Sequence, residues 1–351
     1  MCTVLFIWDY ICGIIVYKSV RGVILSILYK ELINKEIVRL VTHNGRFHAD
    51  DVASYAILDI IFPNNVLHRT RDVGIIESAD IVFDVGGGQF DHHMSDKKYR
   101  ACGLPYASVG LIWEEFGRDF VRQISLNKFN EIGYVITDDD VEYMFKSFDT
   151  DFVKPLDAGD NGVDCVDVIV AEPYSVYDIV NSFNMPHLFV DDSEVSEIEF
   201  EQFKKASEML KGMVRNYFIN LMAEVVGNGV VREAFENRVD PRYVELNENV
   251  DWENELRRLD VDEEVLYVIY RYESLDEYRI QVVRKYENRF EARKDLPAEW
   301  GGLRDGDLAE MTGVEDAVFC HTGLFLGVTR TREGIFKLLE IALGDRVFLR
   351  S

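Results

Sequence analysis

The sequence predicts an α/β protein in which a mostly parallel β-sheet flanked by helices is followed by a second, smaller α+β domain. From Ile37 onward, short β-branched runs alternate with helical patterns, which is typical of a parallel sheet. After residue 228 the pattern changes to consecutive strands. The chain has 351 residues, of which 48% are hydrophobic, so it can form two packed cores. We therefore predict domains at 37–228 and 229–351, preceded by an extension at 1–36.

The extension at 1–36 is strongly apolar. Asp9, Lys18 and Arg21 interrupt every window of its first thirty residues that is long enough to span a bilayer. It is interpreted as an extra helix, a targeting segment or a membrane anchor. We favour the extra helix, expect no stable membrane partner, and expect the extension to be an addition that the fold can lose.

The first domain alternates strands and helices along the chain. A strand beginning at Ile37 leads through a turn into a helix that Pro63 ends, and two more strands and further helices follow. The predicted strands lie within 37–45, 66–72 and 79–88, the helices at 49–62, 107–121, 136–156 and 193–227, and a loop at 157–162.

The second domain begins where the helical pattern is expected to end, after Gly227. Residues 263–272 and 278–286 predict an antiparallel pair around a polar turn. Residues 317–334 then lead into a last helix. This order of elements predicts an α+β domain.

Charge and cysteine content limit the partners and the compartment. The net charge of -25 means that the surface repels nucleic acid, so a polyanionic substrate must be held by bound cations and a local group of Arg or Lys. Five scattered cysteines without a C-x-x-C pair argue against a disulfide framework. We expect a reducing intracellular compartment: cytoplasm, nucleus or a mitochondrion-related organelle.

Two segments carry residues suited to metal chemistry. His43, His48 and Asp50 share the loop after the first strand, while Asp84 ends a later strand and precedes Asp91-His92-His93. Taken alone, the first loop is better interpreted as an ordinary polar loop, but the carboxyl ends of parallel strands meet at one edge of a sheet. Two divalent ions could share a bridging carboxylate there and activate water, and Asp84 is our choice of bridge.

These motifs resemble the DHH phosphoesterase superfamily and, more closely, the melanocyte-proliferating-gene exonuclease family. The resemblance runs from Val38 to the end of the chain. Its motifs, in order, are THNGRFHADD, RTRD, DIVFDVGGG, DHH, ASVGLIWEEFG, LDAGDNG, WGGLRD and FCHTGLFLGVTRTREG. It implies a DHH-like metal-binding catalytic domain followed by a substrate-binding domain.

The resemblance also implies roles for individual residues. His43, His48 and Asp84 would hold one metal, while Asp50, Asp84, His92 and Asp157 would hold the other. Asp91 and His93 would join Asp84 as catalytic residues, with His93 facing the phosphate. In LDAGDNG the sequence alone does not choose between Asp157 and Asp160, and the resemblance favours Asp157. In the superfamily the position of His48 is usually Asp, which leaves metal preference open. We favour Mn or Mg over Zn.

Five further residues are candidates for substrate binding. Arg69 and Arg71 could contact phosphate, brace a ligand carboxylate, or form an ordinary ion pair with Asp72. In the second domain, cationic donors beside flexible glycine backbone suit a nucleotide phosphate, although a hairpin turn with solvated arginines would give the same pattern. These donors are His321, Arg330 and Arg332.

The resemblance implies a 3'-to-5' exonuclease acting on RNA, with roles such as RNA processing in the mitochondrion or nucleus. The acidic surface favours a short or single-stranded substrate, because duplex binding needs many phosphate contacts. Hydrolysis of a small phosphate compound, such as pyrophosphate or a dinucleotide, is the alternative. A non-catalytic binding protein is the third interpretation.

Overall fold

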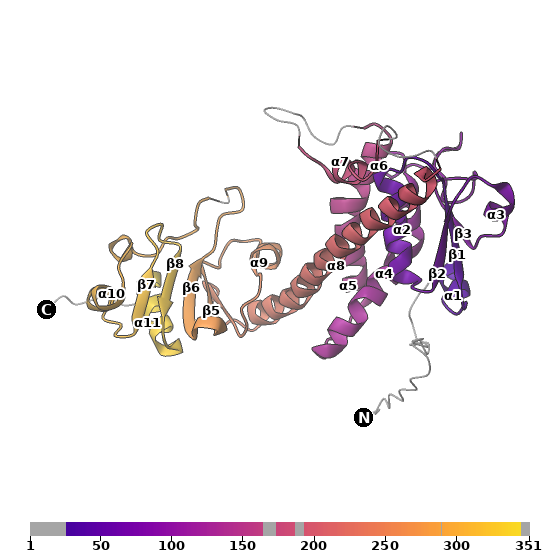
Figure 1. The fold of residues 1–351 in the computed structure, drawn as a ribbon. Helices are drawn as coiled ribbons and strands as arrows, with labels where there is room; N and C mark the ends of the chain where they lie inside the picture. Colours follow the sequence, from indigo (N-terminus) through magenta and orange to yellow (C-terminus); the bar gives the residue numbers. More distant parts are fainter. Residues whose placement is uncertain (1–25, 164–172, 187–192, 289, 345–351) are drawn as a thin grey trace, which may run out of the picture. The chain divides into compact units, whose positions relative to one another are not determined.

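The computed structural model describes residues 26–163, 173–186, 193–288 and 290–344 (Figure 1). The chain divides into two compact units, 1–218 and 219–351, and the division falls inside helix α8 (Val195–Glu236). The predicted α/β fold class is confirmed.

The first unit is built on a small parallel sheet. Its strand order is β2-β1-β3, and both neighbours of β1 run parallel to it. The strands are β1 (Val38–Thr42), β2 (Asn65–Arg69) and β3 (Ile81–Val82). The carboxyl ends of all three strands therefore lie at one edge, and the loops that follow them carry most of the predicted site residues.

Helices α2 and α4 provide much of the core of this unit. Nearly all side chains of α2 are buried, and α4 buries Trp113, Phe116 and Phe120 among other aromatic rings. Helix α4 extends well beyond the predicted helix at 107–121, because Ser125 and Phe129 in its later turns are buried as well. The helices of the unit other than α8 are α1 (Ile27–Leu32), α2 (Ala49–Ile61), α3 (Val73–Glu77), α4 (Ser108–Glu131), α5 (Asp138–Phe148), α6 (Lys154–Asp160) and α7 (Val176–Asn181).

The predicted loop at 157–162 is mostly helical. A single π-helical turn (Asp149–Val153) joins α5 to α6, and α6 continues to Asp160. Leu156 and Ala158 are buried, and Gly159 lies against the ring of Tyr177. Tertiary packing therefore holds a helix where turn-forming residues predicted a loop.

Helix α8 also continues where the sequence suggested strands. We expected the helix to end near Gly227, but it runs to Glu236. A Cβ at position 227 would lie 3.2 Å from a side-chain atom of Val250, so glycine suits this close approach. Val231 lies in the same buried cluster as Val244. This burial compensates for Gly227 and Gly229 in the last turns of the helix.

The second unit contains a mixed sheet of order β4-β5-β6-β8-β7, in which only β4 and β5 are parallel neighbours. The predicted hairpin of β5 and β6 is confirmed, and Asp276 in its turn is left-handed with φ 51°. The strands are β4 (Tyr243–Leu246), β5 (Tyr267–Tyr272), β6 (Glu277–Val282), β7 (Ala317–Cys320) and β8 (Leu326–Thr329). The helices are α9 (Glu253–Leu259), α10 (Asp305–Thr312) and α11 (Arg332–Leu343).

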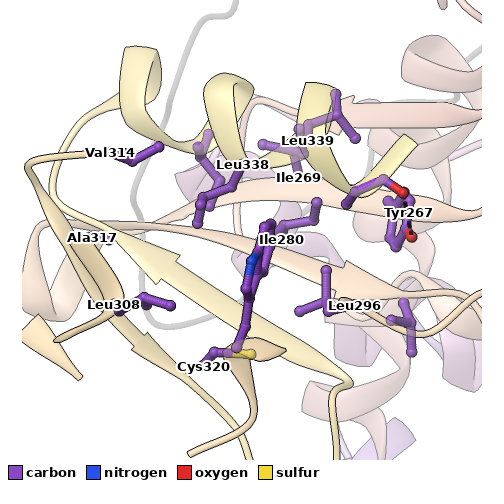
Figure 2. Close-up of a cluster of buried hydrophobic side chains, with 14 residues drawn as sticks. Tyr267, Ile269, Ile280, Leu296, Leu308, Val314, Ala317, Cys320, Leu338 and Leu339 are labelled. Atoms are coloured by element: carbon purple, nitrogen blue, oxygen red, sulfur yellow. Dashed lines mark hydrogen bonds between the residues drawn. The ribbon is translucent and has the colours of Figure 1, made fainter. Parts of the chain in front are cut away.

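One face of this sheet packs against α11. Figure 2 shows Ile269 and Ile280 from β5 and β6 beside Leu338 and Leu339 from α11, with Cys320 in the same buried cluster. Cys102 and Cys320, the cysteines among the described residues, are both free. Within the described part of the chain, no helix has the length and apolar character needed to cross a membrane.

The end of the predicted N-terminal extension packs into the first unit. Residues 1–25 lie outside the described residues, but Tyr29 and Leu32 of α1 are buried. The Tyr29 ring lies 5.9 Å from Phe62, and its hydroxyl donates to Gln123 at 3.2 Å. Helix α1 is therefore part of this core, so deletion of the whole extension would remove core side chains.

We expect Leu32→Ala to lower the free energy of unfolding by about 2–5 kcal/mol, because it leaves a cavity at a buried position. Ile27→Ala in the same helix is the matched control, since Ile27 is 76% exposed whereas Leu32 is 3% exposed. Urea denaturation of the full chain measures both. Equal losses in the two variants would contradict the packing of α1.

Candidate metal centre

The loop after β1 and the first turn of α2 bring two imidazoles and two carboxylates together. His48 precedes the helix, and its backbone N–H donates to Asp51 Oδ1 at 2.9 Å. Asp50 and Asp51 occupy the first helical turn, where the helix dipole favours negative charge. His43 Nε2 lies 3.2 Å from Asp51 Oδ2. We did not predict Asp51 as a site residue, although a carboxylate three residues after a helix cap is a sequence signal.

Asp84 lies between two groups of histidines. It follows β3 with a left-handed φ of 56°, a conformation that costs energy in a non-glycine residue. Its Oδ2 lies 3.2 Å from His43 Nε2, and its Oδ1 lies 3.2 Å from His92 Nε2. Ser108 Oγ also donates to Oδ1 at 3.1 Å. The two carboxylate oxygens of Asp84 therefore face different partners.

The three residues of the Asp91-His92-His93 triplet have different roles. Asp91 organises the loop, because its carboxylate accepts from Gly87 N at 2.7 Å and from His93 N at 3.0 Å. It also lies 2.9 Å from His93 Nδ1. His92 points into the buried cluster, whereas the His93 side chain is 64% exposed. His93 is thus oriented by Asp91 at the solvent side of the cluster.

The structure brings Asp160, and not Asp157, to the cluster. Asp160 Oδ2 lies 3.0 Å from His92 Nε2, and Tyr177 donates its hydroxyl to Oδ1. The carboxylate of Asp157 is instead held by Arg100 and by backbone N–H groups of α4. Our expectation of Asp157 as a ligand is therefore replaced by Asp160, because the oxygens of Asp157 are already used inside the fold.

The donor set fits divalent ions. Two ligand atoms that are each about 2.1 Å from one ion lie about 3.0 Å apart at a right angle and about 3.4 Å apart at a tetrahedral angle. The N–O distances around Asp84 are 3.2, 3.2 and 3.4 Å and lie in this range. Ligand atoms within 4.8 Å of one another form three groups: His43, His48 and Asp84; Asp84, His92 and His93; and His48, Asp50 and Asp160.

Asp50 is the strongest sign that the cluster needs a cation. The residue is fully buried, and neither carboxylate oxygen has a hydrogen-bond partner among the residues that the structure describes. Burial, together with the nearby charges of Asp84, Asp160 and Asp51, raises the pKa of Asp50 well above its ordinary value. A buried carboxylate without donors is costly unless it is protonated or binds a cation. The residues present therefore fit a bound metal.

The histidines respond to the same carboxylates. Burial alone would lower the pKa of His43, but hydrogen bonding to Asp51 and Asp84 raises it to about 10. For His92, burial again opposes the shift, and Asp160 and Asp84 raise the pKa to about 9. A metal needs the unprotonated nitrogen, so metal binding at these residues must release protons.

A cavity of about 230 Å³ adjoins the triplet. The glycine turn at Gly87 and Gly88 lines it together with Asp91 and His92. Lys97 and Lys98 also line it, and both are exposed. The cavity thus offers cationic groups next to the candidate metal ligands in an acidic chain.

Arg69 and Arg71 brace the loop that carries His43 and His48. Arg69 Nη2 donates to Gly45 O at 2.7 Å, and its guanidinium lies over the Phe203 ring at 4.6 Å. Arg71 Nη1 donates to the backbone oxygen of Asn44 at 2.6 Å. These contacts favour a bracing role, and the proposed contact of either arginine with phosphate stays a prediction.

The three candidates in the second unit differ in their partners. Arg332 forms a two-point ion pair with Glu245, at 2.6 Å for each contact. His321 Nδ1 accepts from Gly323 N at 2.9 Å, and Arg330 is exposed just after β8. A phosphate would have to compete with Glu245 for Arg332, so His321 and Arg330 are the more accessible candidates.

Comparison with known proteins gives the family. The family model MYG1_exonuc, described as "Uncharacterised protein family (UPF0160)", matches residues 39–343. A MYG1 protein of Schizosaccharomyces pombe is 28% identical over 327 residues, which cover 88% of this chain and 98% of the relative. The MYG1 exonuclease of Homo sapiens is 28% identical over 341 residues, which cover 89% and 87% respectively. The solved pGpG-specific phosphodiesterase PggH from Vibrio cholerae matches with a TM-score of 0.27 and 11% identity, covering 89% of this chain and 98% of that one. Because the family model matches most of its length, this chain belongs to the MYG1 exonuclease family, UPF0160.

Proposed function

We propose that this protein is a metal-dependent phosphodiester hydrolase that removes nucleotides from the 3' end of RNA. The observation that carries the proposal is the position of Asp84, whose two oxygens face His43 on one side and His92 on the other. Divalent ions, when bound, would activate water and neutralise the phosphoryl group. The name of the human relative, MYG1 exonuclease, agrees with this chemistry.

The candidate ligands would form two metal sites. His43, His48 and Asp84 would hold one ion, and Asp50, Asp84, His92 and Asp160 would hold the other. Carboxylate-rich sites with some imidazole suit Mn, and Mg where water completes the shell, so we favour these ions over Zn.

His93 and Asp91 would act on the substrate. Asp91 holds the Nδ1 side of the His93 ring at 2.9 Å, which leaves Nε2 for a substrate oxygen. The exposed ring can thus donate a hydrogen bond to the phosphoryl group or a proton to the leaving 3' oxygen. Lys97 and Lys98 in the adjoining cavity would attract the phosphate backbone near the scissile bond.

The net charge of the chain limits which form of nucleic acid it can bind. A net charge of -25 opposes the many phosphate contacts that duplex binding requires, so we propose a short or single-stranded RNA. The free Cys102 and Cys320 support a reducing compartment, such as cytoplasm, nucleus or mitochondrion.

A small phosphate compound is the second candidate substrate. The cavity of about 230 Å³ is smaller than the sites that bind drug-sized molecules, which typically have volumes of roughly 300–1,000 Å³. It would suit pyrophosphate or one end of a dinucleotide.

Incubation of the full chain with Mn, Mg or Zn and with end-labelled RNA, the matching DNA, a dinucleotide and pyrophosphate tests the proposal. We expect stepwise shortening of 5'-labelled RNA with Mn or Mg, and slower loss of DNA. The Asp84→Asn variant, purified in parallel, excludes a contaminating nuclease. Hydrolysis of pyrophosphate or dinucleotide alone would favour the second candidate, and no hydrolysis with any metal would contradict both.

A further inference from the structure

A buried guanidinium joins the segments around the metal centre. Arg100 lies in the chain segment after His93, and its side chain is 8% exposed. Its Nη1 and Nη2 donate to Asp149 at 2.6 and 2.8 Å, and its Nε donates to Asp157 at 2.6 Å. Arg100 thus links this segment to the π-helical turn and to α6.

Asp157 in turn holds the start of α4. The residue before this helix, Ala107, has no side chain able to cap it. The Asp157 carboxylate accepts from Ala107 N at 2.9 Å and from Gly110 N at 3.1 Å, so it caps the helix from another part of the chain. A Cβ at Gly110 would overlap the Asp157 carboxylate, so this approach requires glycine.

Each linked segment supplies a group of the metal centre. Ser108, the first residue of α4, donates its hydroxyl to Asp84 at 3.1 Å. Asp160 ends α6, three residues after Asp157, and contacts His92. Movement of the Arg100–Asp157 pair would therefore displace ligands on both sides of the cluster.

We propose that Arg100 and Asp157 are positioning residues that set the geometry of Asp84 and Asp160 for metal binding. The inference rests on the metal centre of the proposed function and not on any particular substrate. Outer partners of metal ligands typically change metal affinity by about 10–100-fold when they are removed. A pair that serves only stability would leave the metal affinity of the folded protein unchanged.

The test compares Mn affinity, by titration calorimetry on folded full chain, in Arg100→Met and Arg293→Met. The second variant is the matched control, because Arg293 forms an equally buried pair with Asp260 in the second unit. We expect Arg100→Met to bind Mn about 10–100-fold more weakly and Arg293→Met to bind like the wild type, although both lose thermal stability. Unchanged Mn affinity in folded Arg100→Met overturns the proposal.

Ser108→Ala provides the measurement if Arg100→Met does not fold, because it removes one hydroxyl and keeps the buried pair. We expect weaker Mn binding there too. Where Arg100→Met folds, the double variant should lose less Mn affinity than the sum of the two single losses, since the pair acts on Asp84 through Ser108. Wild-type affinity in Ser108→Ala, or full additivity, overturns this connection. Mn binding without hydrolysis of any substrate would contradict the proposed function and still leave this comparison decisive.

Discussion

Asp84→Asn is expected to lower the hydrolysis rate by about a hundredfold or more, the loss typical when one preorganised charge-stabilising group is removed. The Asp84 carboxylate faces both groups of histidines, so its charge would serve two ions at once. Asparagine keeps the shape of the side chain and also tolerates the left-handed φ of 56°. The fold should therefore survive while the rate does not.

The measurement is the steady-state rate with saturating Mn, together with circular dichroism to check the fold. Asp119→Asn is the matched control, because Asp119 is also a buried aspartate of the first unit and accepts from Ser26 N at 3.1 Å. We expect Asp119→Asn to retain the rate. Activity of Asp84→Asn above about a tenth of wild type would remove Asp84 from the bridging role, since the bridge hypothesis requires a far larger loss.

The sequence predicted the strands, and the site residues in the loops after them, where a local strand pattern is followed by residues suited to metal chemistry. Each strand of the parallel sheet was predicted from a short β-branched run, and parallel strands place their following loops at one edge. This geometry is why His43, Asp84 and His92 could be assigned to one place from residues far apart in the chain. The antiparallel pair of β5 and β6 was likewise predicted from alternation around a polar turn.

The sequence did not predict the roles of residues that depend on contacts with distant parts of the chain. Asp157 and Asp160 are both polar residues of one short helix, and only the contacts with Arg100 and His92 separate their roles. Arg100 itself lies in no recognisable motif. Arg332 was a candidate for substrate binding because of its charge. Its partner Glu245 lies far away in the chain, so no local sequence pattern predicts their ion pair.

Asp50→Asn is expected to abolish hydrolysis and, at the same time, to stabilise the metal-free protein. The Asp50 carboxylate is fully buried, has no hydrogen-bond partner in the described part of the chain, and lies near the charges of Asp84 and Asp160. An amide removes one negative charge and can donate to those carboxylates. We expect a gain of about 1–3 kcal/mol in the free energy of unfolding, the usual cost of one unsatisfied buried polar group.

Thermal unfolding with EDTA and with Mn separates the two effects. With EDTA, Asp50→Asn should melt several degrees above the wild type, because about 1 kcal/mol shifts the Tm of a unit of this size by roughly 2–4 °C. With Mn the order should reverse, since a ligand stabilises only the protein that binds it. Asp59→Asn is the control, because Asp59 is paired with Lys211 outside the metal cluster and its loss should destabilise under both conditions. If Asp50→Asn melts below the wild type in EDTA, the buried carboxylate does not destabilise the metal-free protein through its unpaired charge. If Mn stabilises Asp50→Asn as much as it stabilises the wild type, Asp50 is not a ligand.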